Sequence, residues 1–200
     1  MKKTKITQIA AVLLLIILPL VSFASGAPVV KLTKGANKML TLRVGAIQSE
    51  SIKVTLKDNF GHLLFSEQVT EKNEFIKRFD LNNLKSGHYK IEVESEMNIR
   101  VMPVQVNWED IEIMEQEFSV LNKPFIKMNA NGIFDFNLLN LESQKTTVLI
   151  LDDKGKVVYK DYLGAFAEYK RRYDLSQLDK GNYNIIVNKG NRSYEKLISN

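Results

Sequence analysis

Apolar and polar residues alternate along most of the chain after residue 38, and the apolar positions are rich in β-branched and aromatic side chains. A period of two with this composition is typical of half-buried β-strands. In the first half of the chain this pattern predicts strands over Leu40–Val44, Ile52–Leu56, Phe75–Phe79, Tyr89–Val93 and Ile99–Val101. In the second half it predicts strands over Phe134–Leu138, Val148–Ile150 and Tyr183–Val187.

A shift of 94 residues aligns the sequence with itself without a gap. Residues 51–65 then lie over residues 145–159, and residues 79–89 lie over residues 173–183. The identical pairs include Asp58/Asp152, Gly61/Gly155, Arg78/Arg172, Asp80/Asp174, Leu84/Leu178, Gly87/Gly181 and Tyr89/Tyr183. A register of this length without gaps indicates two copies of one domain that arose by duplication.

Each copy has the turns and strand spacing of a β-sandwich. The segments Asp58–Gly61 and Asp152–Gly155 are typical of hairpin turns, in which Asp bonds the backbone and Gly takes the left-handed position. About seven short strands in about 80 residues are characteristic of an immunoglobulin-like sandwich. We therefore predict an all-β chain with two tandem immunoglobulin- or fibronectin-like β-sandwiches after a signal peptide.

One motif recurs in both copies. Residues 84–89 and 178–183 share the form Leu-x-x-Gly-x-Tyr ahead of an alternating strand. The motif resembles the tyrosine corner of immunoglobulin-like and fibronectin-like sandwiches, in which the tyrosine hydroxyl bonds an upstream backbone group. The resemblance gives Gly87, Tyr89, Gly181 and Tyr183 a structural role.

The N-terminus has the layout of a secretory signal peptide. Three lysines precede an apolar run from Ile9 to Val21, and Ser22-Phe23-Ala24 follows as a small-x-Ala cleavage site. The alternative, a membrane anchor helix, requires a longer run without Pro19. We predict a signal peptide over residues 1–24, a first sandwich over 25–106, an acidic join over 107–123 and a second sandwich over 124–200. No stable membrane span is expected once the signal is removed.

Composition argues against nucleic-acid binding and against cysteine chemistry. The chain has 28 basic and 23 acidic residues, and loss of the three signal lysines leaves 25 basic residues. This small excess gives no support to nucleic-acid binding, which depends on a strong basic patch. Because there is no cysteine, disulfides, thiol chemistry, cysteine-bound metals and acylation of a lipoprotein cysteine are excluded.

Catalytic motifs are missing from the sequence. There is no Gly-x-Ser-x-Gly elbow, His-Glu-x-x-His or glycine-rich phosphate loop, and His62 and His88 are the only histidines. We expect no enzyme activity, no catalytic residue, no cofactor and no metal site. Hydrolysis by a pair of carboxylates is kept as a reserve hypothesis.

The join over residues 107–123 mixes five acidic residues with apolar ones between Trp108 and Phe118. It has three interpretations: a solvated acidic linker, a short helical turn, or the first strand of the second repeat through Ile111, Ile113 and Val120. Calcium binding is disfavoured, because no loop has acidic residues at alternating positions around a central glycine.

Aromatic residues are concentrated in the second copy. Tyr162, Phe166 and, in the join, Trp108 are candidate binding residues that could stack on a sugar or contact a peptide. Packing in the core or between the domains is the alternative explanation. Each copy is also of a size at which one core is marginal, so we expect the copies to bury apolar surface against each other or against another chain.

The second copy resembles a known family. The pattern Val-x-Leu-x-Asp-x-x-Gly-x-x-Val, then Asp-Leu-x-x-Leu-x-x-Gly-x-Tyr, then Lys-Leu-Ile is similar to the C-terminal sorting domain of type IX secretion cargo and to related small secreted domains of Gram-negative bacteria. The matching positions are Val148, Leu149, Asp152, Gly155, Val158, Asp174, Leu175, Leu178, Gly181, Tyr183, Lys196 and Ile198. The resemblance implies an exported protein, located in the periplasm, on the cell surface or outside the cell.

Two functional hypotheses follow. The first is an exported, non-catalytic binding or structural module, whose partner is a protein or a glycan and whose strand edges could support self-association. The alternative is a small type IX secretion cargo in which the C-terminal repeat acts as the sorting domain.

Overall fold

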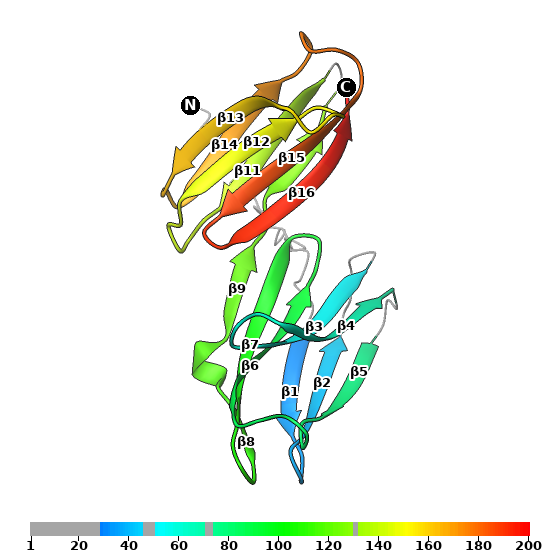
Figure 1. Cartoon of the computed structure of the whole chain (residues 1–200), viewed down its shortest axis with the longest axis vertical. Helices are drawn as coiled ribbons and strands as arrows, with labels where there is room; N and C mark the ends of the chain where they lie inside the picture. Colours follow the sequence, from blue (N-terminus) through cyan, green and yellow to red (C-terminus); the bar gives the residue numbers. More distant parts are fainter. Residues whose placement is uncertain (1–28, 46–50, 71–73, 130–131) are drawn as a thin grey trace, which may run out of the picture.

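A computed structural model describes residues 29–45, 51–70, 74–129 and 132–200. Within these residues the chain forms sixteen β-strands and one short 3-10 helix. They build two β-sandwiches that follow one another along the long axis of the molecule (Figure 1). The predicted cleavage after Ala24 lies outside the described residues.

The first sandwich packs a small sheet against a large one. The small sheet has the order β1 (Val29–Lys34), β2 (Met39–Gly45), β5 (Glu74–Asp80). The large sheet has the order β4 (Leu63–Val69), β3 (Ile52–Asp58), β6 (Gly87–Glu94), β7 (Asn98–Val106), β8 (Ile111–Ile113), and β9 (Ser119–Asn122) also pairs with β7.

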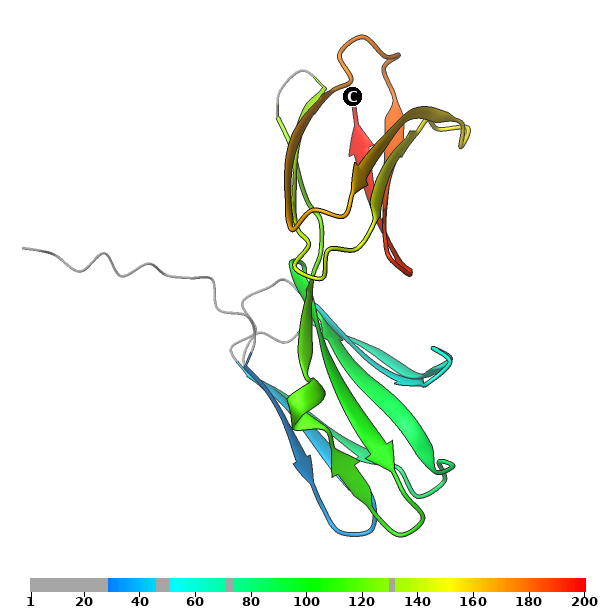
Figure 2. The ribbon, with the colours of Figure 1, turned by 90° about the vertical axis from the view of Figure 1, so that its left-hand side faces the viewer.

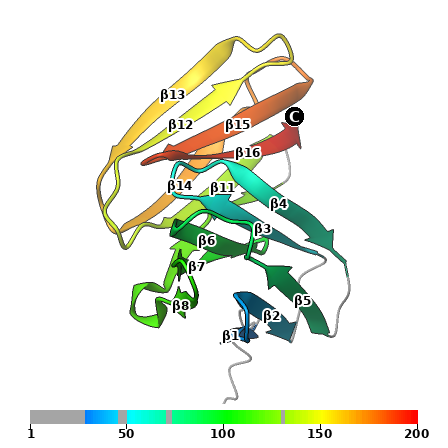
Figure 3. The ribbon, with the colours of Figure 1, turned by 60° about the horizontal axis from the view of Figure 1, so that its bottom comes forward.

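The second sandwich repeats this layout. Its small sheet has the order β10 (Phe125–Met128), β11 (Ile133–Leu139), β14 (Glu168–Asp174), and its large sheet β13 (Val157–Gly164), β12 (Thr146–Leu151), β15 (Asn182–Lys189), β16 (Arg192–Ser199) (Figure 3). Neighbouring strands are antiparallel throughout. The predicted fold class, two tandem immunoglobulin- or fibronectin-like sandwiches, is confirmed.

The strands reproduce the sequence repeat. Both bounds of β2 and β5 lie 94 residues before those of β11 and β14. Strands β3, β4 and β7 also begin 94 residues before β12, β13 and β16. A constant offset means that each pair of equivalent positions faces the same side of its sheet, because side chains alternate with a period of two.

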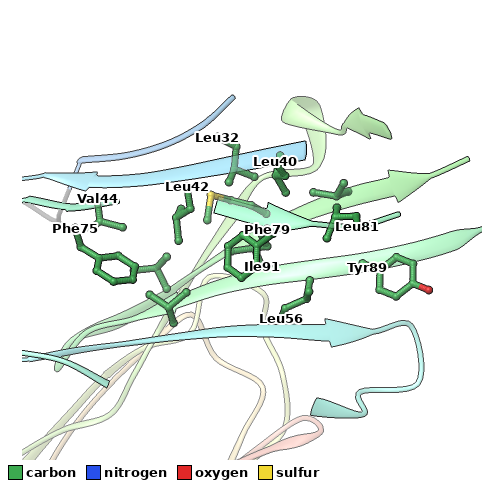
Figure 4. Close-up of a cluster of buried hydrophobic side chains, with 14 of the residues drawn as sticks. Leu32, Leu40, Leu42, Val44, Leu56, Phe75, Phe79, Leu81, Tyr89 and Ile91 are labelled. Atoms are coloured by element: carbon green, nitrogen blue, oxygen red, sulfur yellow. The ribbon is translucent and has the colours of Figure 1, made fainter. Parts of the chain in front are cut away.

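The alternating pattern places the apolar side chains inside each sandwich. Leu40, Leu42 and Val44 of β2 are fully buried, whereas Arg43 between them is exposed. They meet side chains of the facing sheet such as Ile91 (Figure 4). The second sandwich has a core of its own around fully buried side chains of β11, β12 and β15.

Each sandwich has an apolar core of its own. The buried apolar side chains form one cluster in each sandwich, and only Ile99 and Val101 of β7 are buried outside both clusters in the described residues. An ion pair between Arg192 and Glu92 links the sandwiches. The expectation that the copies bury apolar surface against each other or against another chain stays a prediction.

The join belongs to the first sandwich. Strand β8 pairs with Val104–Val106 of β7, and β9 pairs with Asn98–Val101 of the same strand. Ile111 is fully buried in the first core. The hypothesis that this segment is the first strand of the second repeat is therefore wrong, since β10 takes that place.

The path of the chain explains why the join has strand structure. Strand β7 ends at the pole of the first sandwich that points away from the second one (Figure 2). The chain must return along β7 to reach the second sandwich. It does so as β8, a 3-10 turn over Glu115–Glu117 (η1) and β9, which pair with the edge of β7 on the way.

Candidate functional site

The two Leu-x-x-Gly-x-Tyr motifs form equivalent local structures. The Tyr89 hydroxyl donates to the Lys85 carbonyl oxygen at 2.9 Å, and the Tyr183 hydroxyl donates to the Asp179 carbonyl oxygen at 2.7 Å. Both rings are buried. Each bond ties the loop that precedes β6 or β15 to the strand, as in a tyrosine corner.

The three candidate aromatic residues do not lie together. Trp108 is in the turn between β7 and β8 of the first sandwich, whereas Tyr162 is on β13 and Phe166 is in the turn between β13 and β14 of the second. All three are exposed, Trp108 most of all at 86%. The candidate residues therefore belong to two separate surfaces, one with Trp108 and one with Tyr162 and Phe166. They cannot act together as one stacking platform.

The second-sandwich aromatics are partly engaged within their own domain. The ammonium group of Lys160 lies 4.6 Å from the centre of the Tyr162 ring. The rings of Phe166 and Tyr169 are in edge-to-face contact, with their centroids 6.1 Å apart. The backbone N–H of Phe166 donates to the Tyr169 hydroxyl at 2.6 Å. The two contacts of Phe166 hold the turn between β13 and β14 against β14.

Trp108 lies beside a bowl of about 800 Å³ at the distal pole, which is the end of the first sandwich opposite the second one. Three segments form this bowl: the turn between β1 and β2, the loop between β5 and β6, and the turn between β7 and β8. The lining residues are Asn37, Lys38, Asn82, Leu84, Lys85, Ser86, Trp108 and Glu109. Sequence reasoning found Trp108 but not the others, because they come from turns that lie far apart in the chain.

A charge cluster joins the two sandwiches. Glu92 of β6 is 6% exposed and receives hydrogen bonds from Arg192 of the second sandwich, at 2.5 Å, and from Lys57 of β3, at 2.7 Å. Burial by itself would raise the pKa of Glu92, but the bonds from Arg192 and Lys57 outweigh burial and hold this pKa below its ordinary value. Glu92 therefore stays ionised at neutral pH and holds a cation from each side of the junction.

The two histidines have surface positions. His62 is exposed, and its Nδ1 lies 2.8 Å from the Asp58 carboxylate within the same turn. His88 is also exposed. In the described parts of the chain, no three His, Asp or Glu side chains are grouped so that they could hold a metal ion. No helix in those parts has the length and hydrophobicity that a transmembrane helix needs.

A family model named for the secretion system C-terminal sorting domain matches residues 35–106 and again residues 130–200. The two matches cover more than half of the chain. The chain belongs to this family, and each of its sandwiches is a domain of the type IX sorting class.

Among solved structures, the chain is similar to a segment of two fibronectin type III domains from chicken tenascin, at 12% identity and a TM-score of 0.29, covering 86% of this chain and 99% of that one. It is also similar to the FN1–FN3 domains of chicken CNTN1, at 12% identity and a TM-score of 0.30, covering 88% and 67%. The BSP domain of a biofilm associated protein matches at 12% identity and a TM-score of 0.29, covering 85% of this chain, which spans 28% of that chain. None of the curated proteins matches the chain.

Proposed function

We propose that the chain is a cargo of the type IX secretion system in a Gram-negative bacterium, delivered to the cell surface or the medium. In this proposal the second sandwich is the sorting domain, and the first sandwich is the module that is delivered. The observation that carries the proposal is the match of the sorting-domain family to residues 130–200. The proposal also assigns no catalytic role to either sandwich and no nucleic-acid partner.

Family membership alone does not choose between the sandwiches, because the model matches both. The large sheets differ at one edge, and this difference favours the second. In the first sandwich, β8 and β9 cover the outer edge of β7. In the described part of the second sandwich, β16 pairs only with β15. A receptor that reads the last strand of the domain can therefore reach β16, whereas the equivalent strand β7 is covered.

The test compares two isogenic host strains, one with the secretion system and one without it. The full chain is expected on the surface or in the medium of the competent strain and in the periplasm of the deficient strain. Protease accessibility on intact cells distinguishes these places. Equal distribution in the two strains would overturn the proposed route.

A pair of substitutions then tests which sandwich is read. Leu197 of β16 is 69% exposed, and Leu64 of β4 in the first sandwich is 46% exposed. We expect Leu197→Arg to leave the protein in the periplasm of the competent strain, and Leu64→Arg to be exported as the wild type is. The opposite result would assign the sorting signal to the first sandwich.

A further inference from the structure

Trp108 has no evident role in the fold. Its side chain is 86% exposed at the tip of a tight turn, where the Asn107 N–H donates to the Asp110 carbonyl oxygen at 2.8 Å. Tight turns favour Gly, Asn and Asp, so a large apolar residue gains nothing there from local conformation. An exposed aromatic side chain beside a concave surface is a common feature of binding sites.

The backbone of the distal pole also carries strain. Asn37 and Lys38 are the central residues of a turn that the Met39 N–H closes on the Ala36 carbonyl oxygen at 3.1 Å, between β1 and β2, and both have φ of 53°. Asn tolerates this left-handed conformation, but glycine is the residue that fits the second position of such a turn without strain. Lys38 therefore occupies its position at a conformational cost and brings a cationic side chain to the bowl.

The polar groups around Trp108 are held in fixed positions. The Asn82 side-chain N–H₂ group donates to the Asn37 carbonyl oxygen at 2.8 Å, which ties the loop between β5 and β6 to the turn between β1 and β2. The bond from the Tyr89 hydroxyl fixes the carbonyl group of Lys85. The bowl is thus largely preformed, so that a ligand would not have to order these loops.

The charge in the bowl is positive on balance. Lys38 and Lys85 face a single acidic lining residue, Glu109. The neighbouring Asp110 is paired with Lys34 on β1 and adds little free negative charge. Six of the eight lining residues carry polar or charged groups, and Trp108 and Leu84 are the two apolar ones.

We propose that the bowl binds one pyranose unit of an acidic polysaccharide, a sugar chain that carries carboxylate groups. One face of a pyranose ring presents C–H groups with a partial positive charge, and these pack on the negative face of an indole ring. The amide group of Asn37, the amide oxygen of Asn82 and the hydroxyl group of Ser86 can exchange hydrogen bonds with the sugar hydroxyls, whereas the Asn82 N–H₂ group is already donated to Asn37 and Asp80. The ammonium groups of Lys38 and Lys85 can bind its carboxylate.

The site is particular to the first sandwich. The turn that carries Trp108 connects β7 to β8 of the first sandwich. At the offset of 94 residues, Lys38 corresponds to Gly132 and Lys85 to Asp179. The proposal concerns the delivered module, and it is tested on the purified protein without reference to the export route.

Trp108 is the single tryptophan of the chain, so its fluorescence reports on the site directly. The probes are polygalacturonate, which is an acidic sugar chain, dextran, which is a neutral one, and poly-L-glutamate, which is an anionic chain without sugars. We expect a saturable blue shift of the emission with polygalacturonate, at least about tenfold weaker binding of dextran, and no shift with poly-L-glutamate. An equal response to poly-L-glutamate would show an anionic peptide site, and no response to polygalacturonate would overturn the proposal.

Affinity gel electrophoresis in polygalacturonate tests the residues. We expect Trp108→Ala to lose at least about tenfold in affinity. Phe60→Ala is the matched control, because Phe60 is 85% exposed in the turn between β3 and β4 of the same sandwich and does not line the bowl. Equal retardation of the wild type and Trp108→Ala would overturn the platform role of Trp108.

Lys38→Gly separates binding from folding. We expect this variant to bind polygalacturonate about threefold or more weakly, because one cation is lost. The same variant should unfold at a higher temperature than the wild type, because glycine relieves the left-handed strain. A variant that becomes more stable and still binds as the wild type does would exclude Lys38 from the site.

Discussion

The two sandwiches share one strand layout and differ at the outer edge of the last strand. On β7, Val101 and Met102 are buried, and β8 and β9 cover that edge. The equivalent residues of β16 are Glu195 and Lys196, both exposed. A covered edge can carry apolar residues, whereas charged residues on an open edge oppose uncontrolled strand pairing. After the duplication, the residues of this strand differ according to whether the edge is covered, while the core register stayed the same.

The largest effect should come from equivalent buried positions in the two cores. Leu42 and Phe136 are equivalent positions on β2 and β11, and both are fully buried. We expect Leu42→Ala to lower the free energy of unfolding of the first sandwich by about 2–5 kcal/mol, and Phe136→Ala to lower that of the second by about 3–5 kcal/mol. Hydrogen exchange across a urea series, resolved by peptide, measures each sandwich separately. If each substitution destabilised both sandwiches equally, the two cores would not be independent.

The second prediction concerns β8, which covers part of the outer edge of β7. Ile111 of β8 is fully buried in the first core although it follows the end of the repeat. We expect Ile111→Ala to lower the stability of the first sandwich by about 2–4 kcal/mol and to leave the second unchanged. The same exchange measurement applies. A loss confined to the second sandwich would return the join to the second repeat.

The fold class and the central strands were predictable from the sequence, because alternation, turn residues and the 94-residue repeat constrain the same register. The edge strands β1, β4, β13 and β16 were not predicted, because most of their side chains are exposed or only half-buried and give no clear alternation. The loop-to-strand bonds of Tyr89 and Tyr183 follow from a local motif of six residues. The distal bowl was not predictable, because it combines turns at Asn37, Asn82 and Trp108 whose proximity depends on how the sheets pack. The junction was not predictable either, since Glu92 and Arg192 lie 100 residues apart. Their equivalents in the other copy, Ile186 and Asn98, are uncharged, so the repeat does not mark them.

The third effect concerns the junction and depends on pH. Arg192 and Lys57 hold the pKa of Glu92 below its ordinary value of 4.5 in spite of burial. The stabilisation is therefore present in full above pH 4.5 and is lost as the pH falls through the lower pKa of the folded state. We expect a coupling of about 1–2 kcal/mol between Glu92 and Arg192 in a double-mutant cycle with Glu92→Gln and Arg192→Met.

Small-angle scattering should follow the same titration. The spread of distances between the two sandwiches should widen in the wild type as the pH falls below 4.5 and through the lowered pKa of Glu92, because protonation removes the charge on Glu92. The Glu92→Gln variant should have the wider spread at every pH. An unchanged distribution in acid would show that the Glu92 cluster does not set the arrangement of the sandwiches.

The smallest effects concern two tyrosine hydroxyls of the second sandwich. Tyr173 is buried, and its hydroxyl donates to the Asp161 carboxylate at 2.9 Å, whereas the equivalent residue of the first sandwich is Phe79. Tyr173→Phe therefore gives the second sandwich the residue of the first and leaves a half-buried carboxylate without this donor. We expect a loss of about 1–2 kcal/mol in the stability of the second sandwich.

Tyr162 is the matched control, because it lies on β13 with Asp161 but is 72% exposed. Tyr162→Phe keeps the ring over which Lys160 lies and removes a hydroxyl on the exposed surface, so its effect should stay within about 0.5 kcal/mol. Both variants are measured by urea unfolding of the full chain, with hydrogen exchange to assign the loss to the second sandwich. Equal losses would mean that burial of the hydroxyl does not decide the cost. A loss at Tyr173 alone would show that the second sandwich gains stability from a hydrogen bond that the first sandwich, with Phe79 at this position, does not have.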